Sequence, residues 1–217
     1  AKNFVANVFS WMVVGLLITG FVASYAASSG LYVQLVGSGG LMMWVILLSP
    51  FAFIIAMNAG LQKFSATTLT LLFLAFSGVM GLSLSSVFLV YSMGSITQVF
   101  LITAGTFAVM AFAGYTTSVD LSKFGALLFM ALIGIIIASV VNFFMQSSMM
   151  EFIISVGGVL VFTGLTAYDT QRIKRIGAGV EYGTAGATKL AILAAVSLYL
   201  NFVNLFLFLL RLLGGRN

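Results

Sequence analysis

The amino-acid sequence predicts an all-α integral membrane protein with seven transmembrane helices. Of its 217 residues, 62% are hydrophobic and only 6% are charged, whereas a soluble domain carries about 25% charged residues. The apolar residues also stand in long runs that only short segments separate. Backbone polar groups in lipid must be paired within a helix or a closed barrel, and barrel strands are about ten residues of alternating polarity, so the long runs favour helices.

The first three apolar runs each have a length that suits a membrane-spanning helix, roughly 17–25 residues. The run 8–27 follows Lys2 as a signal peptide would, but it exceeds the about 7–15 apolar residues of such a segment, so we expect a true helix. The run 41–57 contains Pro50, the only proline of the chain. The run 67–90 carries small residues, which let helices approach closely in lipid.

The remaining four apolar runs cover 95–115, 121–145, 152–168 and 190–213. The connections between runs are short and rich in glycine and serine, and none is long enough to separate two domains. We therefore expect one seven-helix transmembrane domain over residues 1–217, with a monomer as the favoured state and membrane lipid around it.

Lysine and arginine are distributed unevenly over the connections. If the N-terminus lies inside, only Arg211 and Arg216 lie on the outer side. The cations on the cytoplasmic side are then Lys2, Lys63, Lys123, Arg172, Lys174, Arg175 and Lys189. Cytoplasmic loops of membrane proteins carry the excess of positive charge. We therefore expect a multi-pass protein of the cell (inner) membrane, with the N-terminus in the cytoplasm and the C-terminus outside.

The composition argues against several functions. The chain has no cysteine and no histidine, so the commonest metal ligands and acid–base groups are missing, and we expect neither an enzyme nor a cofactor. The cations form no patch for nucleic acid. A retinal Schiff base needs a lysine deep in the last helix, whereas Lys189 lies at its beginning. Intramembrane aspartyl proteolysis needs two membrane aspartates, and only Asp169 is there.

Asp169 lies in the stretch GLTAYDTQRIKR (164–175), where an apolar run meets a basic cluster. An ionisable residue in a membrane span is costly and therefore a functional candidate. The alternative is that Asp169 has only a structural role, as a local ion pair with Arg172, three residues further on. The other acidic residues have ordinary interpretations: Asp120 as N-cap of the helix that follows it, Glu151 at a helix N-terminus, and Glu181 in a solvated loop.

A polar stripe on the last helix offers Asp169 a partner. Ser197, Asn201 and Asn204 stand at positions i, i+4 and i+7, which share one face of a helix. Because a short loop joins the last two helices, Asn201 is placed to share a hydrogen bond with Asp169. Further polar residues that could extend an internal path are Asn142, Ser139, Gln146, Ser83, Ser85 and Ser86. Two readings stay open for these residues: a conduction pathway, or ordinary interhelical hydrogen bonding.

The stretch GLTAYDTQRIKR, followed by SLYLNFVNLFLFLLR (197–211), resembles the Bax inhibitor-1 family, also called the transmembrane Bax inhibitor motif proteins. The segments 120–144 and 76–91 are similar to its bacterial branch. The resemblance implies seven helices with the last one at the centre. It also implies a pH-sensitive calcium leak, in which two carboxylates near the cytoplasmic side share a proton and hold the pore shut.

The chain departs from this pattern at one position. Asp169 matches the first carboxylate, but Asn201 stands where the second is expected. A carboxamide can hydrogen-bond Asp169 but cannot ionise, so the repulsion between two like charges is missing. We expect a weaker or acid-shifted pH response, or a protein held in one state, and only weak passage of calcium ions near Asp169. The neighbours of this gate would be Arg172, Ser197, Asn204 and Asn142.

The resemblance also leaves an alternative function open. Bacterial relatives are associated with a membrane-anchored AAA protease that degrades misfolded membrane proteins. The alternative is therefore a regulatory membrane protein that modulates such a protease. That role would need an accessible cytoplasmic N-terminus and no pore.

Overall fold

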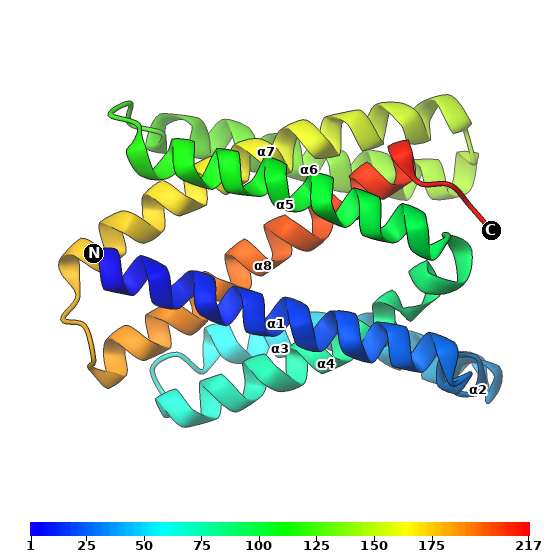
Figure 1. Ribbon diagram of the computed structural model, residues 1–217, viewed down its shortest axis with the longest axis horizontal. Coiled ribbons are helices and arrows are strands. Elements are labelled where there is room, and N and C mark those ends of the chain that lie inside the picture. The colour runs from blue at the N-terminus through cyan, green and yellow to red at the C-terminus, as the bar shows by residue number, and fades with distance from the viewer. The chain divides into compact units, whose positions relative to one another are not determined.

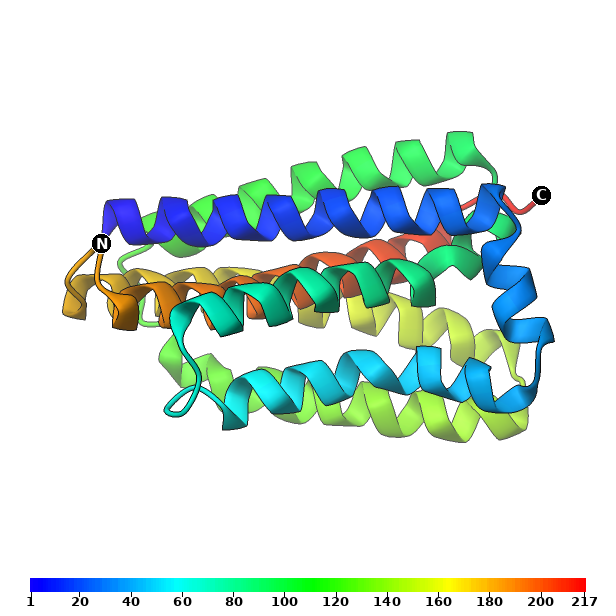
Figure 2. The same ribbon diagram turned by 90° about the horizontal axis from the view of Figure 1, so that it is seen from below.

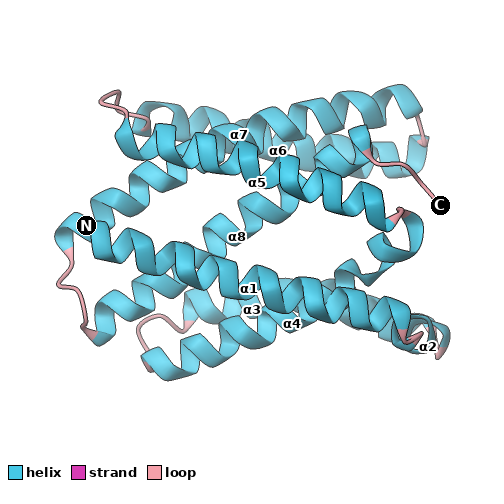
Figure 3. Cartoon of the chain, viewed as in Figure 1, coloured by secondary structure: helices cyan, strands magenta, loops and turns pink.

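The computed structural model describes residues 1–217 and consists of helices joined by short loops, without a β-strand (Figures 1 and 3). The helices are α1 (Lys2–Ser28), α2 (Leu31–Gly37), α3 (Gly40–Ala59), α4 (Ala66–Val90), α5 (Met93–Thr116), α6 (Ser122–Met145), α7 (Ser148–Gly179) and α8 (Ala185–Leu213). All except α2 are long and apolar enough to cross a membrane. The predicted fold class, an all-α membrane protein with seven spans, is confirmed.

Two elements differ most from the prediction. The short helix α2 lies in a connection that was expected to be a loop. Helix α7 continues past its predicted end at Tyr168 as far as Gly179. The apolar run stops at Tyr168, but the polar residues that follow find partners on neighbouring elements and stay helical. Asp169 therefore lies inside a helix and not at its end.

Helix α3 contains Pro50 without a break. Proline has no N–H to donate to the carbonyl four residues earlier, which here is that of Ile46. That carbonyl accepts two hydroxyl bonds instead, from Ser49 at 3.2 Å and from Ser83 of α4 at 2.8 Å. Neighbouring hydroxyls commonly satisfy the backbone at prolines in membrane helices.

Replacing Ser83 with alanine is expected to lower the stability of the protein by about 1 kcal/mol, because the Ile46 carbonyl loses its shorter hydrogen bond. The check is the thermal unfolding temperature of the purified protein in detergent. Ser10→Ala is the matched control, since the exposed Ser10 hydroxyl bonds only a carbonyl of its own helix. Equal unfolding temperatures for the two variants would contradict the prediction.

The chain forms two compact units, and α7 and α8 each contribute to both. The first unit contains residues 1–92, 177–199 and Asn217, and in it α1 and α4 run side by side (Figures 1 and 2). A Cβ atom on Gly81 would lie 2.8 Å from the carbonyl oxygen of Thr19, so only glycine permits this approach. Tyr199 of α8 is fully buried against Phe73 and Phe76, and its hydroxyl lies 2.5 Å from the Thr19 hydroxyl.

The second unit contains residues 93–176 and 200–216. Helix α7 packs against α5 at Gly114, where a Cβ atom would lie only 2.2 Å from the carbonyl oxygen of Ala167. It packs against α6 at Gly125, which faces the ring of Tyr168. Small residues thus bring backbones together, which is how helices associate in lipid. Both contacts lie within two turns of Asp169 and fix α7 at that level.

The spans differ strongly in burial. Two thirds of the most apolar stretch of α8 is buried, whereas the corresponding stretch of α6 has no buried residue. A helix that is apolar on all sides yet exposed suits a position against lipid acyl chains. Most of this stretch of α8 is thus enclosed by other parts of the protein. This enclosure means that any polar residue on α8 needs a partner within the protein.

Candidate functional site

Asp169 of α7 and Asn201 of α8 form a buried polar contact in the second unit. Only 8% of Asp169 and 5% of Asn201 is exposed. The carboxamide Nδ2 of Asn201 donates a hydrogen bond to Oδ2 of Asp169 at 2.7 Å. A buried polar group without a partner would be costly, and each of these two side chains supplies a partner to the other. The hydrogen bond expected from the sequence is present.

Arg172 approaches the other carboxylate oxygen. Its Nε lies 3.8 Å from Oδ1 of Asp169, and its side chain is 49% exposed against 11% for the aspartate side chain. An exposed ion pair at this separation contributes little to stability. Asp169 thus has one close contact to α8 and one longer contact to a half-exposed cation. The two partners considered from the sequence are not alternatives, because each takes one oxygen.

The buried threonines beside Asp169 on α7 form hydrogen bonds within their own helix. Thr166 and Thr170 are buried, and their hydroxyls donate to the carbonyls of Phe162 and Thr166, respectively. Such bonds to the preceding turn are usual for threonine in a helix. Both threonine hydroxyls are therefore engaged by their own helix. The carboxylate is left to Asn201 and Arg172.

The other members of the expected site do not reach Asp169. Asn204 donates to the carbonyl of Leu200 at 2.8 Å, and Ser197 bonds within its own helix as well. The structure places Asn142 far from the carboxylate, since its Oδ1 accepts from the N–H of Ser147, just before α7 begins. Along α7, that point is about 30 Å from Asp169. Only Asn201 of the polar stripe bonds across to α7.

The expected internal polar path has the character of ordinary hydrogen bonding. Ser85 and Ser139 donate to carbonyls one turn earlier in their own helices, and Ser83 serves the carbonyl freed by proline in α3. Gln146 is exposed and ends α6 in a left-handed conformation with φ 51°. These contacts favour the second of the two readings left open by the sequence.

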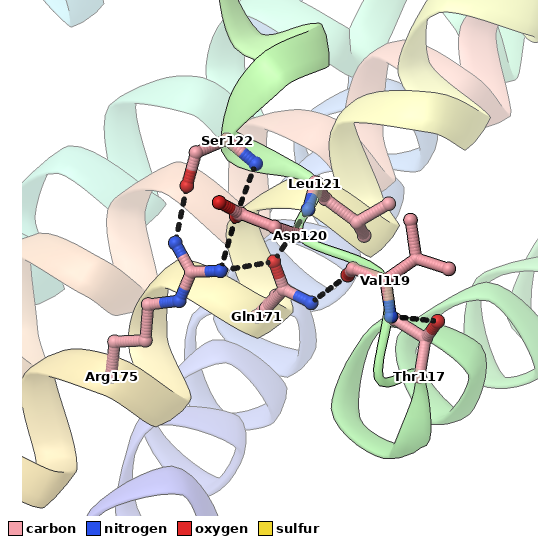
Figure 4. A network of polar contacts seen from close by, with 7 residues as sticks. All are labelled: Thr117, Val119, Asp120, Leu121, Ser122, Gln171 and Arg175. Carbon is pink, nitrogen blue, oxygen red and sulfur yellow. Dashed lines mark hydrogen bonds and ion pairs between the residues drawn. The ribbon is translucent and has the colours of Figure 1, made fainter.

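A second polar cluster, which sequence reasoning missed, joins α7 to the loop between α5 and α6 (Figure 4). Both ends of the Gln171 carboxamide bind the backbone of this loop. Its Nε2 donates to the carbonyl of Val119 at 2.8 Å, and its Oε1 accepts from the N–H of Leu121 at 2.9 Å. We call this arrangement, together with the contacts of Arg175, the loop clamp.

Arg175 forms the outer layer of the loop clamp, at the surface. Its guanidinium donates to Oδ1 of Asp120 at 2.5 Å, to Oε1 of Gln171 at 2.8 Å and to the hydroxyl of Ser122. The hydrogen bond from Arg175, followed by the bonds from Ser122, lowers the pKa of Asp120 far below its ordinary value. The carboxylate therefore stays charged, and the ion pair intact, through neutral and mildly acidic pH.

Asp120 was expected to be the N-cap of α6. The N-cap position is Leu121 instead, and no side chain caps it. Oδ1 of Asp120 accepts from the N–H of Ser122, the first residue of α6, at 3.0 Å, so the carboxylate still serves the start of the helix. Glu151 lies in the first turn of α7, and Glu181 is exposed, both as expected.

The basic cluster that follows Asp169 contributes to packing as well as to the orientation of the protein in the membrane. Nζ of Lys174 donates to the carbonyl of Tyr115 in the last turn of α5 at 2.8 Å and lies 4.7 Å from the centre of the Tyr115 ring. A cation at the last carbonyls of a helix is favourable.

The sequence held one signal of the loop clamp, namely the spacing of Gln171 and Arg175, which share a helix face. It gave no indication of the loop that they bind.

The fold and the site define a multi-pass α-helical membrane protein with one buried carboxylate held by a neighbouring helix. Residues 1–217 match the family model described as Inhibitor of apoptosis-promoting Bax1. The chain belongs to the Bax inhibitor-1 family, which confirms the resemblance seen in the sequence.

Relatives with similar sequences include proteins of three bacteria. The inner membrane protein YbhL of Escherichia coli K12 is 46% identical over 216 residues, which cover 99% of this chain and 92% of the relative. An uncharacterized protein of Borreliella burgdorferi is 45% identical over 216 residues, covering 99% and 93%. The uncharacterized protein RP147 of Rickettsia prowazekii is 38% identical over 219 residues, covering 99% and 90%.

Proposed function

We propose that this protein is a calcium-leak type membrane channel that the contact between Asp169 and Asn201 holds closed. The observation that carries the proposal is the buried hydrogen bond of 2.7 Å between α7 and α8, at the one buried carboxylate of the chain. A group of this kind in a membrane span is a candidate for an ion pathway or a proton relay. It links the last two spans at a point where loss of a proton, with entry of water, would change the contact.

Protonation of Asp169 is the switch in this proposal. A protonated carboxyl can stay buried against Asn201 at little cost, whereas a charged carboxylate in apolar surroundings gains strongly from hydration. Arg172 is the only cation paired with it, at 3.8 Å. Loss of the proton therefore favours a state in which α7 and α8 separate and water reaches the carboxylate. The leak is expected to rise with pH.

Calcium passage fits a site with few ligands. Asp169 supplies a carboxylate, and the Asn201 carboxamide supplies one further oxygen. Tight calcium sites use six to eight oxygen ligands with several carboxylates, and no group of three or more acidic, histidine or cysteine side chains is present. Conduction requires binding that is weak enough for the ion to leave. The proposed site would therefore bind a passing calcium ion only weakly.

The setting of this channel is also part of the proposal. The name of the YbhL relative places that protein in the inner membrane, and the cation distribution favours a cytoplasmic N-terminus and an outside C-terminus. The site then lies near the cytoplasmic side. No catalytic reaction is part of the proposal.

The test is calcium flux into proteoliposomes between pH 5 and 8, for the unmodified protein and for Asp169→Asn. The unmodified protein is expected to leak more at the alkaline end. Asp169→Asn keeps the shape of the pair but removes the titrating group, so its flux is expected to lose the pH dependence. A flux that keeps its full pH profile in Asp169→Asn would remove Asp169 from the mechanism.

A further inference from the structure

Helix α7 carries two polar contacts on opposite faces, only two residues apart. Asp169 bonds Asn201 of α8, and Gln171 bonds the loop between α5 and α6. With 3.6 residues per turn, positions two apart point about 200° away from each other. The helix is therefore held from both sides at the same level. A movement that changes one contact must change the other.

The Gln171 contact is suited to fixing the rotation of α7. The side chain is only 7% exposed, and it makes two bonds to backbone atoms on either side of Asp120. Two bonds from one planar carboxamide restrain both the height of the helix and its rotation. Removing the side chain would take these partners from the Val119 carbonyl and the Leu121 N–H, which are part-buried contacts, and the loop would no longer be bonded to this face of α7.

Arg175 fixes the orientation of the Gln171 carboxamide. A guanidinium has only donors, so the bond of 2.8 Å from Nη2 must go to Oε1 of Gln171. The oxygen then faces the N–H of Leu121, and Nε2 faces the carbonyl of Val119. The ion pair with Asp120 holds Arg175 in place from the loop side. The outer layer at the surface thus supports the buried layer (Figure 4).

We propose that Gln171 is a positioning residue that holds α7 in the rotation in which Asp169 meets Asn201, and that opening requires the loop clamp to release. This inference rests on the proposed function only for its consequence on flux. Side chains reach about 5–6 Å from the helix axis, so a rotation of about 30° displaces them by about 3 Å. Such a displacement breaks the Asp169–Asn201 hydrogen bond and both backbone bonds of Gln171.

The first test is the pH profile of calcium flux for Gln171→Ala. Because the variant no longer favours the closed state, its profile is expected to move toward acidic pH. Flux at the acidic end is expected to rise about five- to tenfold, the change in population when a contact of hydrogen-bond strength stops favouring one state. Gln171→Glu keeps an acceptor for Leu121 and Arg175 but cannot donate to Val119, so an intermediate profile is expected.

Lys174→Met is the matched control, because the Lys174 amine bonds the end of α5 and not the loop that Gln171 binds. Its profile is expected to keep the midpoint of the unmodified protein. If Gln171 only stabilised the fold, Gln171→Ala would unfold at a lower temperature, but the midpoint of its flux profile would not move. That result would overturn the positioning role.

The second test does not depend on flux. The chain has no cysteine, so Thr170→Cys places a single thiol beside Asp169 at a position that is almost fully buried. Its reaction with a small water-soluble methanethiosulfonate is expected to be slow in the otherwise unmodified protein and at least several-fold faster with Gln171→Ala. Unchanged protection would overturn the inference. Faster labelling without calcium flux in any variant would support the positioning role of Gln171 and refute the proposed channel function.

Discussion

Replacing Asn201 with aspartate is expected to give the strongest pH response of any single substitution in this protein. The two side chains lie 2.7 Å apart in a buried contact. Two carboxylates at that separation cannot both be charged, so they share a proton and titrate as a coupled pair. When the second proton leaves, the contact changes from attraction to repulsion. The calcium leak of Asn201→Asp is expected to change about tenfold or more over pH 5–8.

Two variants control for the added charge and for the direction of the contact. Asn204→Asp adds a carboxylate to the same helix, but the Asn204 side chain bonds its own backbone, so no coupled pair forms and the steep response should be absent. The exchange Asp169→Asn with Asn201→Asp keeps one carboxylate and one carboxamide. Its pH profile is expected to match that of the unmodified protein.

Two outcomes would sink the prediction. A flux of Asn201→Asp that follows the profile of the unmodified protein would show that the contact does not control conduction. If the unmodified protein, Asn201→Asp and the exchange all fail to conduct, the proposed channel function is refuted. The regulatory alternative, a membrane protein that modulates a membrane-anchored AAA protease, would then be the hypothesis to test.

Seven spans were readable from the sequence because lipid imposes one simple requirement, a long apolar run. The same signal failed at α7. The residues from Asp169 to Arg175 are polar, so the apolar run ends at Tyr168 while the helix continues to Gly179. What keeps this segment helical is a set of partners on α8 and in the loop between α5 and α6. Those partners are distant in sequence, so no local pattern indicates them.

The contact between Asp169 and Asn201 is the exception, because the sequence did predict it. Consecutive spans joined by a short loop lie close together, and a carboxylate in a span needs a partner. The spacing of Ser197, Asn201 and Asn204 correctly placed them on one face, but it did not indicate which would bond across. Serine and asparagine can satisfy themselves on the preceding turn of their own helix, as Ser197 and Asn204 do. Only the geometry of the neighbouring helix decides between these outcomes.

The contact between α5 and α7 is expected to be the part of the fold least tolerant of added volume. A Cβ atom on Gly114 would lie 2.2 Å from the carbonyl oxygen and 2.7 Å from the Cα atom of Ala167. Both are backbone atoms and cannot move aside as a flexible side chain can. Gly114→Ala must therefore push the two helices apart, and overpacking of this kind costs about 1–3 kcal/mol or more. Gly114→Leu is expected to prevent folding.

Gly105→Ala is the matched control on the same helix, because a Cβ atom there meets nothing within 4 Å. Alanine has the higher helix propensity, by about 1 kcal/mol, so this variant should unfold at the same temperature or slightly higher. Gly114→Ala should unfold several degrees lower in detergent, and equal temperatures for the two variants would refute the packing argument. Ala167 lies two residues before Asp169, so the same displacement should move the carboxylate away from Asn201. Gly114→Ala is therefore also expected to raise the leak at acidic pH, where the unmodified protein is closed.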